Sequence, residues 1–200
     1  MHTITPYFQD RLDRVEARLD AYYGIPEWHE FLPAVDELVC TILSQNTNDI
    51  NRDKAFDNLK QTFSSWEAVR DVDPEELMQV IRVAGLANQK GPNIQAALRF
   101  ISDERGEIDL DWLKERSPQE TMDWLTQMKG VGMKTASIVM VFSLDMPAFP
   151  VDTHVYRVSG RLGLRPEKMS IENAHKWFLT SNRPESFGPL HLNIISLGRD

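Results

Sequence analysis

Apolar residues recur at helical spacing along most of the chain. Ile94, Ala97, Leu98 and Ile101 follow the i, i+3, i+4, i+7 pattern of a helix that buries one face. A similar stripe runs over 35–43, whereas no convincing alternating strand pattern is found. The sequence therefore predicts an all-α fold of about nine or ten short helices packed as bundles.

Capping residues and prolines mark the predicted helix boundaries. The segment SPQE (117–120) combines a serine N-cap, proline at the first helical position and glutamate at the third. The segment DPEE (73–76) repeats this arrangement with aspartate as the cap. Pro147 and Pro150 interrupt the last long apolar helix, so 145–151 is predicted to be a short linker.

The composition excludes several classes of protein. No apolar run approaches the ~20 residues that span a bilayer, and no basic segment precedes an apolar N-terminal stretch. The single cysteine, Cys40, excludes disulfides and multi-cysteine metal sites within this chain. We therefore expect a cytoplasmic, monomeric protein with no membrane partner, no metal and no cofactor held by these residues.

The net charge of −8 argues weakly against a nucleic-acid partner, because phosphate binding usually draws on a basic surface. The distribution of charge qualifies this argument. Acidic residues are concentrated near the N-terminus, whereas the balance reverses between 125 and 165. The charged residues there are Lys129, Lys134, Arg157, Arg161 and Arg165 against Asp145 and Asp152. This distribution allows a locally basic face on an acidic protein.

The segment MKGVGMKTA (128–136) predicts a tight turn between two helices. Gly130 can take the left-handed conformation that ends a helix, and Val131 is expected to fill the gap between the helices. Gly132 would let a phosphate approach the unpaired N–H groups of the next helix without a side chain in the way. The alternative is a plain helix–helix corner with Lys134 as a solvated lysine.

The segment FPVDTHVYRV (149–158) places Asp152 at a predicted helix N-cap. A simple capping role is the first interpretation of this aspartate. Lys134 and Asp152 each stand at the start of a helix, with one helix and a short return between them. The two would reach the same cleft only if the second helix turns across the first, which periodicity cannot show.

The stretch MKGVGMKTASIVMVF…FPVDTHVYRVSGRLGL resembles the endonuclease III branch of the helix–hairpin–helix (HhH-GPD) DNA glycosylases. ILSQNTND (42–49) and GLANQKGPNI (85–94) match two further family segments in the same order, and the similarity runs from about residue 30 to the C-terminus. The resemblance implies two helical domains with a DNA-binding cleft between them. These are a helical barrel at 27–146, with the helix–hairpin–helix at about 118–145, and a discontinuous domain of 1–26 plus 147–200.

The resemblance also implies base-excision repair of double-stranded DNA that contains a damaged base or an abasic site. Lys134, as a neutral amine, would attack C1′ and form a Schiff base, and Asp152 would activate the lysine or stabilise the positive sugar. Relatives with a lysine at this position also nick the strand, and an oxidised pyrimidine is the expected substrate. The alternatives are a monofunctional glycosylase for alkylated or mismatched bases and a non-catalytic helix–hairpin–helix DNA-binding module.

Further DNA contacts are expected along the segments that match the family. The candidates are Gln45, Asn46, Lys90, Gly130, Val131, Gly132, Thr135 and Arg157. The family places the side chain that fills the hole left by the flipped base at Asn46, with the longer Gln45 beside it; helix capping is the alternative. Lys90 stands beside a predicted Gly91-Pro92 turn. Arg157 could reach a phosphate or belong to a solvated stripe.

Many endonuclease III relatives carry four cysteines for a [4Fe–4S] cluster shortly after the segment that here reads HLNIISLGRD. This chain stops at Asp200 with Cys40 alone. Either it is truncated before the cluster loop or it belongs to a cluster-free branch. A cluster is expected only if the native protein continues past Asp200 with a four-cysteine loop.

Overall fold

The computed structural model describes residues 5–26, 32–180 and 184–200, and all regular secondary structure in these ranges is helical. In chain order the elements are α1 (Pro6–Tyr23), α2 (Ala34–Ser44), α3 (Asp49–Thr62), α4 (Trp66–Asp71), α5 (Pro74–Val80), η1 (Arg82–Ala84), α6 (Ala87–Arg105), η2 (Asp111–Glu115), α7 (Pro118–Leu125), α8 (Met133–Phe142), α9 (Thr153–Arg161), α10 (Ile171–Leu179), η3 (Pro184–Ser186) and α11 (Phe187–Arg199). The all-α prediction is confirmed. The described α-helices outnumber the prediction, and α4, with 6 residues, is too short for a clear period.

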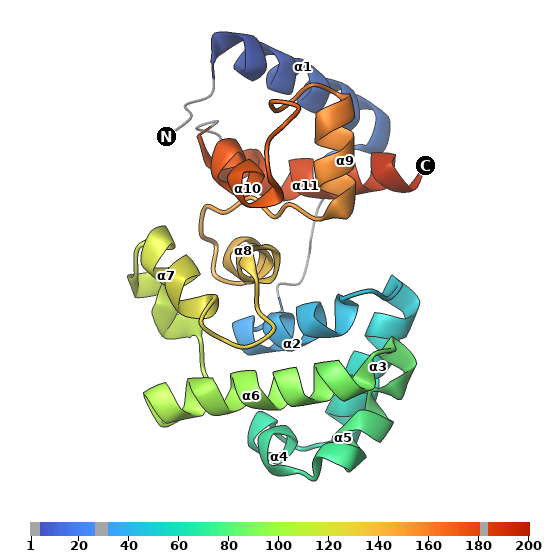
Figure 1. Ribbon diagram of the computed structural model, residues 1–200, viewed down its shortest axis with the longest axis vertical. Coiled ribbons are helices and arrows are strands. Elements are labelled where there is room, and N and C mark those ends of the chain that lie inside the picture. The colour runs from blue at the N-terminus through green and yellow to red at the C-terminus, as the bar shows by residue number, and fades with distance from the viewer. Residues whose placement is uncertain (1–4, 27–31, 181–183) are drawn as a thin grey trace.

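The buried apolar side chains form two separate clusters. The first lies in the lower part of Figure 1, where α2 to α8 surround a core that includes Leu38, Ile42, Leu98 and Val139. These side chains are removed from water because each helix turns its apolar stripe inward. The first cluster draws its members from 34–148.

The second cluster joins the two ends of the chain. Leu12 and Leu19 of α1 pack with Phe149 and with apolar residues of α9, α10 and α11, in the upper part of Figure 1. Asn193 of α11 fixes the end of α1, because its Nδ2 donates to Asp20 Oδ1 and to the carbonyl of Gly24, each at 3.0 Å. Helix α8 lies between the two clusters, and it contacts α2 and α7 on one side and α10 and α11 on the other.

The predicted caps are formed in the structure. The Ser117 hydroxyl accepts from the N–H of Glu120 while the Glu120 carboxylate accepts from the N–H of Ser117, which is a complete capping box for α7. Asp73 caps α5 through the N–H of Glu75 at 2.8 Å. These caps satisfy backbone donors that a helix start otherwise leaves unpaired.

The predicted turn at Gly91-Pro92 is not present. Both residues lie inside α6, which begins at Ala87 after Leu86 takes a left-handed conformation with φ of 49°. Helix α6 continues through Pro92 with the loss of one i→i−4 hydrogen bond, because proline has no backbone N–H. The correction matters for Lys90, which falls on the buried stripe of α6 together with Ile94.

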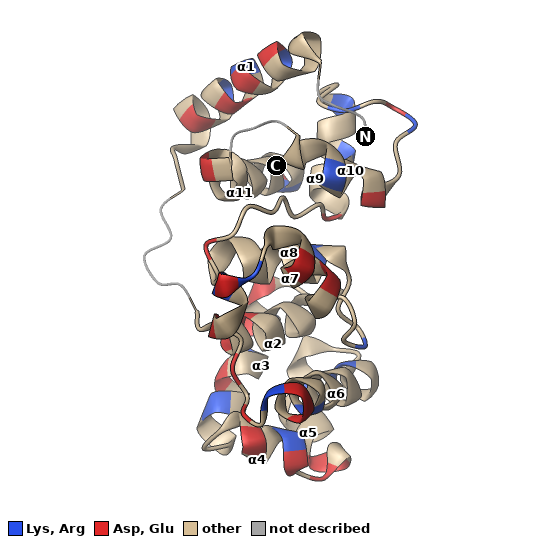
Figure 2. Cartoon of the chain, turned by 90° about the vertical axis from the view of Figure 1, so that its left-hand side faces the viewer, with Lys and Arg blue, Asp and Glu red and all other residues tan. Residues whose placement is uncertain are grey.

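Not all five basic residues between 125 and 165 are exposed. Arg165 is only 6% exposed, and its guanidinium donates to the carbonyl of Tyr156 at 2.9 Å and stacks on the Tyr156 ring. Lys129, Arg157 and Arg161 remain exposed. Figure 2 shows that acidic and basic residues alternate along α1 and occur in both parts of the molecule.

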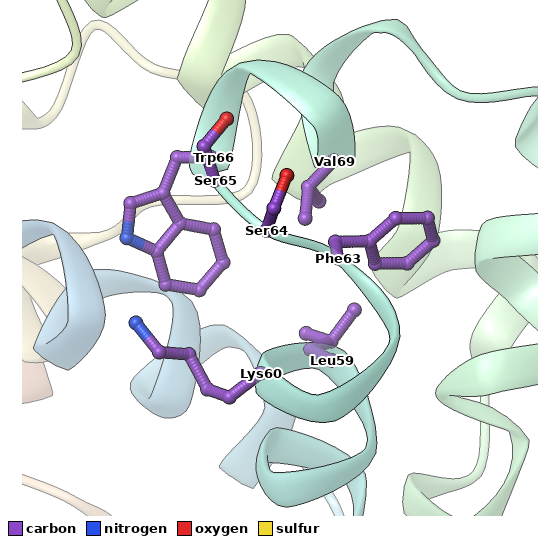
Figure 3. A pocket seen from close by; sticks show the side chains of 7 residues that line it. All are labelled: Leu59, Lys60, Phe63, Ser64, Ser65, Trp66 and Val69. Atoms are coloured by element: carbon purple, nitrogen blue, oxygen red, sulfur yellow. The ribbon is translucent and has the colours of Figure 1, made fainter.

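A small cavity of about 150 Å³ lies at the junction of α3 and α4, away from the glycine hairpin (Figure 3). Its charged side chain, Lys60, is 3.0 Å from Asp36 and lies over the Trp66 ring, whose Nε1 also donates to Asp36. Lys60 and Trp66, which line this cavity, therefore already have a polar partner in Asp36. Among the described residues, no helix combines the length and apolar character that a membrane crossing needs.

Candidate active site

The glycine hairpin connects α7 to α8 at the middle of the molecule. Gly130 has φ of 84°, and a Cβ built there would lie 2.4 Å from Asn93 Nδ2, so glycine is required on both grounds. Val131 is 4% exposed and joins the first cluster, and its N–H donates to the carbonyl of Met128 at 3.1 Å. Gly132, with φ of −96°, faces open space and is the N-cap of α8. No side chain at position 132 therefore blocks the approach of an anion to the backbone amides at the start of α8.

Lys134 is the second residue of α8 and its side chain is half-buried. Burial lowers the pKa of its ammonium below the ordinary value of 10.5, although the charges of Asp152 and Glu37 act in the opposite direction. Arg52 adds to the lowering. The position at a helix start also disfavours a cation. The surroundings of Lys134 therefore favour the neutral amine more than water does.

Asp152 is the N-cap of α9, and its Oδ1 accepts from the N–H of Val155 at 2.7 Å. The aspartate is therefore a cap, as its position in the sequence suggested. Its charge also raises the pKa of Lys134, so the carboxylate lies within electrostatic range of the lysine. The chain leaves α8 at Phe142 and returns to Asp152 through a segment without regular secondary structure.

Three further polar side chains surround Lys134 that the sequence had not singled out. Glu37 and Cys40 lie on α2, and Arg52 lies on α3; all three lie within electrostatic range of the lysine. Burial raises the pKa of Glu37, whose Oε1 accepts from the Thr41 hydroxyl at 3.0 Å. The sequence signal was the spacing of Glu37, Cys40 and Thr41, which lie one helical turn apart on a mostly apolar helix.

His191 of α11 is a fourth neighbour missed by sequence reasoning. Its side chain is 2% exposed, and its Nδ1 is 2.9 Å from the carbonyl of Pro150. Burial lowers its pKa to about 4, while the charge of Asp152 raises the pKa and that of Lys134 lowers it. The ring therefore lies within electrostatic range of both the lysine and the aspartate. No periodic or spacing pattern indicates this histidine as a site residue.

The loop between α2 and α3 presents Asn46 to solvent. Asn46 is exposed and has φ of 53°, an uncommon conformation for a residue with a side chain. Gln45 lies beside it, but its Nε2 donates to the carbonyl of Gly130 at 3.1 Å and so ties this loop to the hairpin. Asn48 caps α3 through the N–H of Asn51 at 2.9 Å. The capping role predicted as an alternative belongs to Asn48, which leaves Asn46 at the tip.

The side chains of Lys90 and Thr135 are buried and are therefore not exposed for contact with DNA. Lys90 is 2% exposed, and its Nζ donates to the carbonyls of Leu43 at 2.7 Å and Ala84 at 2.8 Å. The ammonium therefore joins the end of α2 to the end of η1, which differs from the predicted contact with DNA. Thr135 is 3% exposed, so only its backbone N–H could serve an anion at the start of α8.

Arg157 is exposed on α9, and its Nη2 donates to the carbonyl of Gly198 at 2.7 Å. The same carbonyl is 3.1 Å from Nδ1 of His154. Arg157 therefore fastens the end of α11 to α9, and a phosphate would have to compete with this bond. The structure places Arg157 at the surface but not beside Lys134.

The residues of this chain do not fit a [4Fe–4S] cluster. Such clusters are held by four cysteine thiolates, and Cys40 is the single cysteine here. Burial raises the pKa of its thiol to about 12, which keeps it protonated in its half-buried position on α2. Within the described residues, no group of three or more histidine, cysteine, aspartate or glutamate side chains could hold a metal ion.

Comparisons with known proteins agree with this geometry. Residues 39–179 match the HhH-GPD superfamily of base excision DNA repair proteins. A candidate DNA glycosylase of Arabidopsis thaliana is 40% identical over 133 residues, which are 66% of this chain but only 45% of the plant protein. Endonuclease III of Sulfolobus acidocaldarius is 33% identical over 164 residues, 81% of this chain and 71% of that protein.

A similar solved structure is a trapped covalent intermediate of endonuclease III with DNA. It superposes with a TM-score of 0.81 at 26% identity, covering 96% of this chain and 86% of the other. The family match spans most of the chain, including the α2–α3 loop, the glycine hairpin and Asp152. This chain therefore belongs to the HhH-GPD superfamily of base excision DNA repair proteins, in its endonuclease III-like branch.

Proposed function

We propose that this protein is a bifunctional DNA glycosylase and abasic-site lyase. It would extrude a damaged base from duplex DNA, release that base through a Schiff base on Lys134, and nick the strand by β-elimination. Extrusion is needed because C1′ of the target nucleotide is inaccessible inside the base stack. An oxidised pyrimidine is our expected substrate class.

The observation that carries this proposal is the half-buried Lys134 within electrostatic range of Asp152. A lysine in water is neutral in only about one molecule in a thousand at physiological pH. Burial and the start of α8 both shift Lys134 toward the neutral form that can act as a nucleophile. A lysine kept only for solubility would be expected on an exposed face.

The proposed reaction balances with these two side chains. Lys134 Nζ forms a bond to C1′ as the bond from C1′ to the base breaks, and the base leaves with that electron pair. Asp152 accepts a proton from the attacking amine or offsets the positive charge on the sugar. Opening of the C1′–O4′ bond, with the electron pair leaving on O4′ and a proton passing to that oxygen, then gives the Schiff base. Transfer of a proton from C2′ to water or a basic side chain expels the 3′ phosphate with its electron pair and breaks the strand.

DNA would be held by the two loops that flank the lysine. The open backbone amides behind Gly132 suit a phosphate, and such contacts position DNA without sequence preference. Asn46 is the better candidate for filling the hole left by the flipped base, because it is exposed at the loop tip. Gln45 would instead hold that loop against the hairpin.

The test is a panel of lesion-containing duplexes scored separately for base release and for strand nicking. We expect release and nicking on at least one lesion and on a plain abasic duplex. Lys134→Gln should abolish nicking while binding of abasic DNA is retained, because backbone amides hold the phosphate. Lys129→Gln is the matched control, since Lys129 is exposed on the same hairpin.

The same panel separates the two alternatives. Base release without nicking would identify a monofunctional glycosylase, for which Lys134 is incidental. Binding with neither release nor nicking on any duplex would identify a DNA-binding module. Asp152→Asn should slow base release by about two orders of magnitude or more, the scale of losing a positioned catalytic charge.

A further inference from the structure

The segment that delivers Asp152 to the site has no regular secondary structure, and residues 148–151 of it are buried. Residues 145–152 carry no helix or strand, although Phe149 is 1% exposed and Val151 is 2% exposed. A buried irregular backbone must find partners for its carbonyls outside any helix or sheet. The partners of two successive carbonyls in this segment are histidines.

These two histidines, His175 and His191, form what we call the histidine pair. Nδ1 of His175 on α10 is 2.9 Å from the carbonyl of Phe149, and Nδ1 of His191 on α11 is 2.9 Å from that of Pro150. A carbonyl oxygen can only accept, so each Nδ1 must carry the proton. The two bonds hold adjacent peptide units from two different helices. Both histidines are buried, at 3% and 2% exposure.

We propose that the histidine pair positions Asp152, by pinning the backbone two and three residues before it. The Phe149 ring is fixed as well, stacked on Phe178 at 4.3 Å and edge-on to Phe187. Because the chain is held at Phe149 and Pro150, the position of the start of α9 is fixed relative to Lys134 on α8. This inference rests on the proposed function, in which Asp152 assists release of the base.

The pair acts through geometry and not through charge. Burial lowers the pKa of both rings, that of His191 to about 4, so His191 is neutral at pH 7. The charged or titratable groups that act on His191 are Asp152, Lys134 and His175. Replacing a neutral ring by a neutral side chain leaves the charges around Lys134 unchanged. A change in rate would therefore report a displaced aspartate.

The test compares base release with lysine trapping in the same variant at pH 7.5. In His191→Leu the donor to Pro150 is lost, and we expect single-turnover base release to fall about 10- to 100-fold, as small misplacements of catalytic groups do. Borohydride trapping on a preformed abasic duplex needs no base to leave and should fall less than about threefold. His191→Asn keeps a donor near the Nδ1 position and should recover most of the release rate.

Trp177→Phe is the matched control for general damage to this core. Its Nε1 donates to the carbonyl of Leu164 at 3.0 Å, so the variant also removes a buried bond from a side chain to a carbonyl. It should lower the melting temperature without changing the ratio of release to trapping. If His191→Leu fails to fold, His175→Leu replaces it, with a smaller expected loss because its carbonyl is one residue further from Asp152.

Two results would overturn the inference. One is a folded His191→Leu protein, or His175→Leu in its place, with the wild-type ratio of release to trapping. The other is a parallel fall of both rates that Trp177→Phe reproduces and His191→Asn does not rescue. A wild-type protein without base release on any duplex would instead refute the proposed function, and this inference with it.

Discussion

The charges of Glu37 on α2 and Arg52 on α3 act on Lys134 in opposite directions. Glu37 on α2 raises the pKa of the lysine and Arg52 on α3 lowers it, with burial as the larger influence. Schiff-base formation needs the neutral amine, so its rate should rise with pH through the pKa of Lys134. The two neighbours therefore tune the same group in opposite directions.

Neutralising these neighbours should shift the pH profile of trapping in opposite directions. Glu37→Gln removes a negative charge, lowers the pKa of Lys134 and moves the rising limb to lower pH. Arg52→Gln removes a positive charge and moves that limb to higher pH. The measurement is the single-turnover rate of borohydride trapping between pH 6 and 10, with the exposed Glu104→Gln as control. Limbs that shift together, or not at all, would contradict the role of Lys134 as the titrating nucleophile.

Single residues were predictable from the sequence where a local rule fixed them. Asp152 as a cap and Gly130 in a left-handed turn follow from such rules. Glu37 and His191 were missed because they reach the site through tertiary packing, on helices far away in the sequence. Lys90 was assigned to DNA on resemblance, yet its place four residues before Ile94 on a buried stripe already indicated the interior.

The hairpin between α7 and α8 contains two glycines with different structural needs. Gly130→Ala should destabilise the fold by about 1–2 kcal/mol or more, because its φ of 84° and its contact with Asn93 oppose a Cβ. Gly132→Ala should leave stability almost unchanged, since its φ of −96° is ordinary and the space is open. It should nevertheless weaken binding of abasic and undamaged duplexes alike.

Thermal denaturation and a fluorescence-anisotropy titration of each glycine variant check this contrast. If Gly132→Ala is as stable as the wild type and binds both duplexes as tightly, the hairpin is only a corner between helices. A bulkier Gly132→Leu variant extends the series, because a larger side chain blocks more of the approach to the amides.

The structural role of Lys90, the buried lysine of α6, can be tested by substitution. Lys90→Met should destabilise the protein by about 1–3 kcal/mol, because the carbonyls of Leu43 and Ala84 lose their donor. The dependence of DNA affinity on salt should stay the same, whereas loss of a phosphate contact would reduce the slope by roughly one. Urea denaturation and binding isotherms at several salt concentrations measure both. A reduced slope with unchanged stability would restore Lys90 to the DNA interface.

Elements were the most predictable part of this protein. The α7 capping box and the prolines after α8 locate boundaries directly, because they act on backbone groups next to them. The stripe over 94–101 correctly indicated α6. The predicted Gly91-Pro92 turn was wrong because α6 continues through Pro92, and the local sequence does not distinguish a proline inside a helix from a proline in a turn.

The packing of the whole molecule buries histidines that must stay neutral. Burial lowers the pKa of His191 from 6.5 to about 4, so the unfolded chain takes up its proton first as the pH falls. The free energy of unfolding should therefore be unaffected by His191 above pH 6.5. It should decrease as the pH falls toward 4, by up to about 3 kcal/mol from this residue. His175 adds in the same direction.

Guanidinium denaturation at pH 7.5, 5.5 and 4.5 measures this decline. His191→Asn should flatten the dependence on pH, because the variant has no group to protonate at that position. An equally steep decline in the variant would assign the acid sensitivity to other groups.

The arrangement of the two clusters around α8 could not be predicted from periodicity, since the angle between α8 and α9 depends on packing across both clusters.

The central claim is that Lys134 forms a covalent bond with deoxyribose. Borohydride reduction during reaction with an abasic duplex, followed by proteolysis and mass spectrometry, identifies the amine that carries the adduct. We predict a single reduced adduct on the peptide containing Lys134, and no trapping by Lys134→Gln. An adduct on Lys129 or another amine, or base release from a lesion duplex with no adduct at all, would contradict the account.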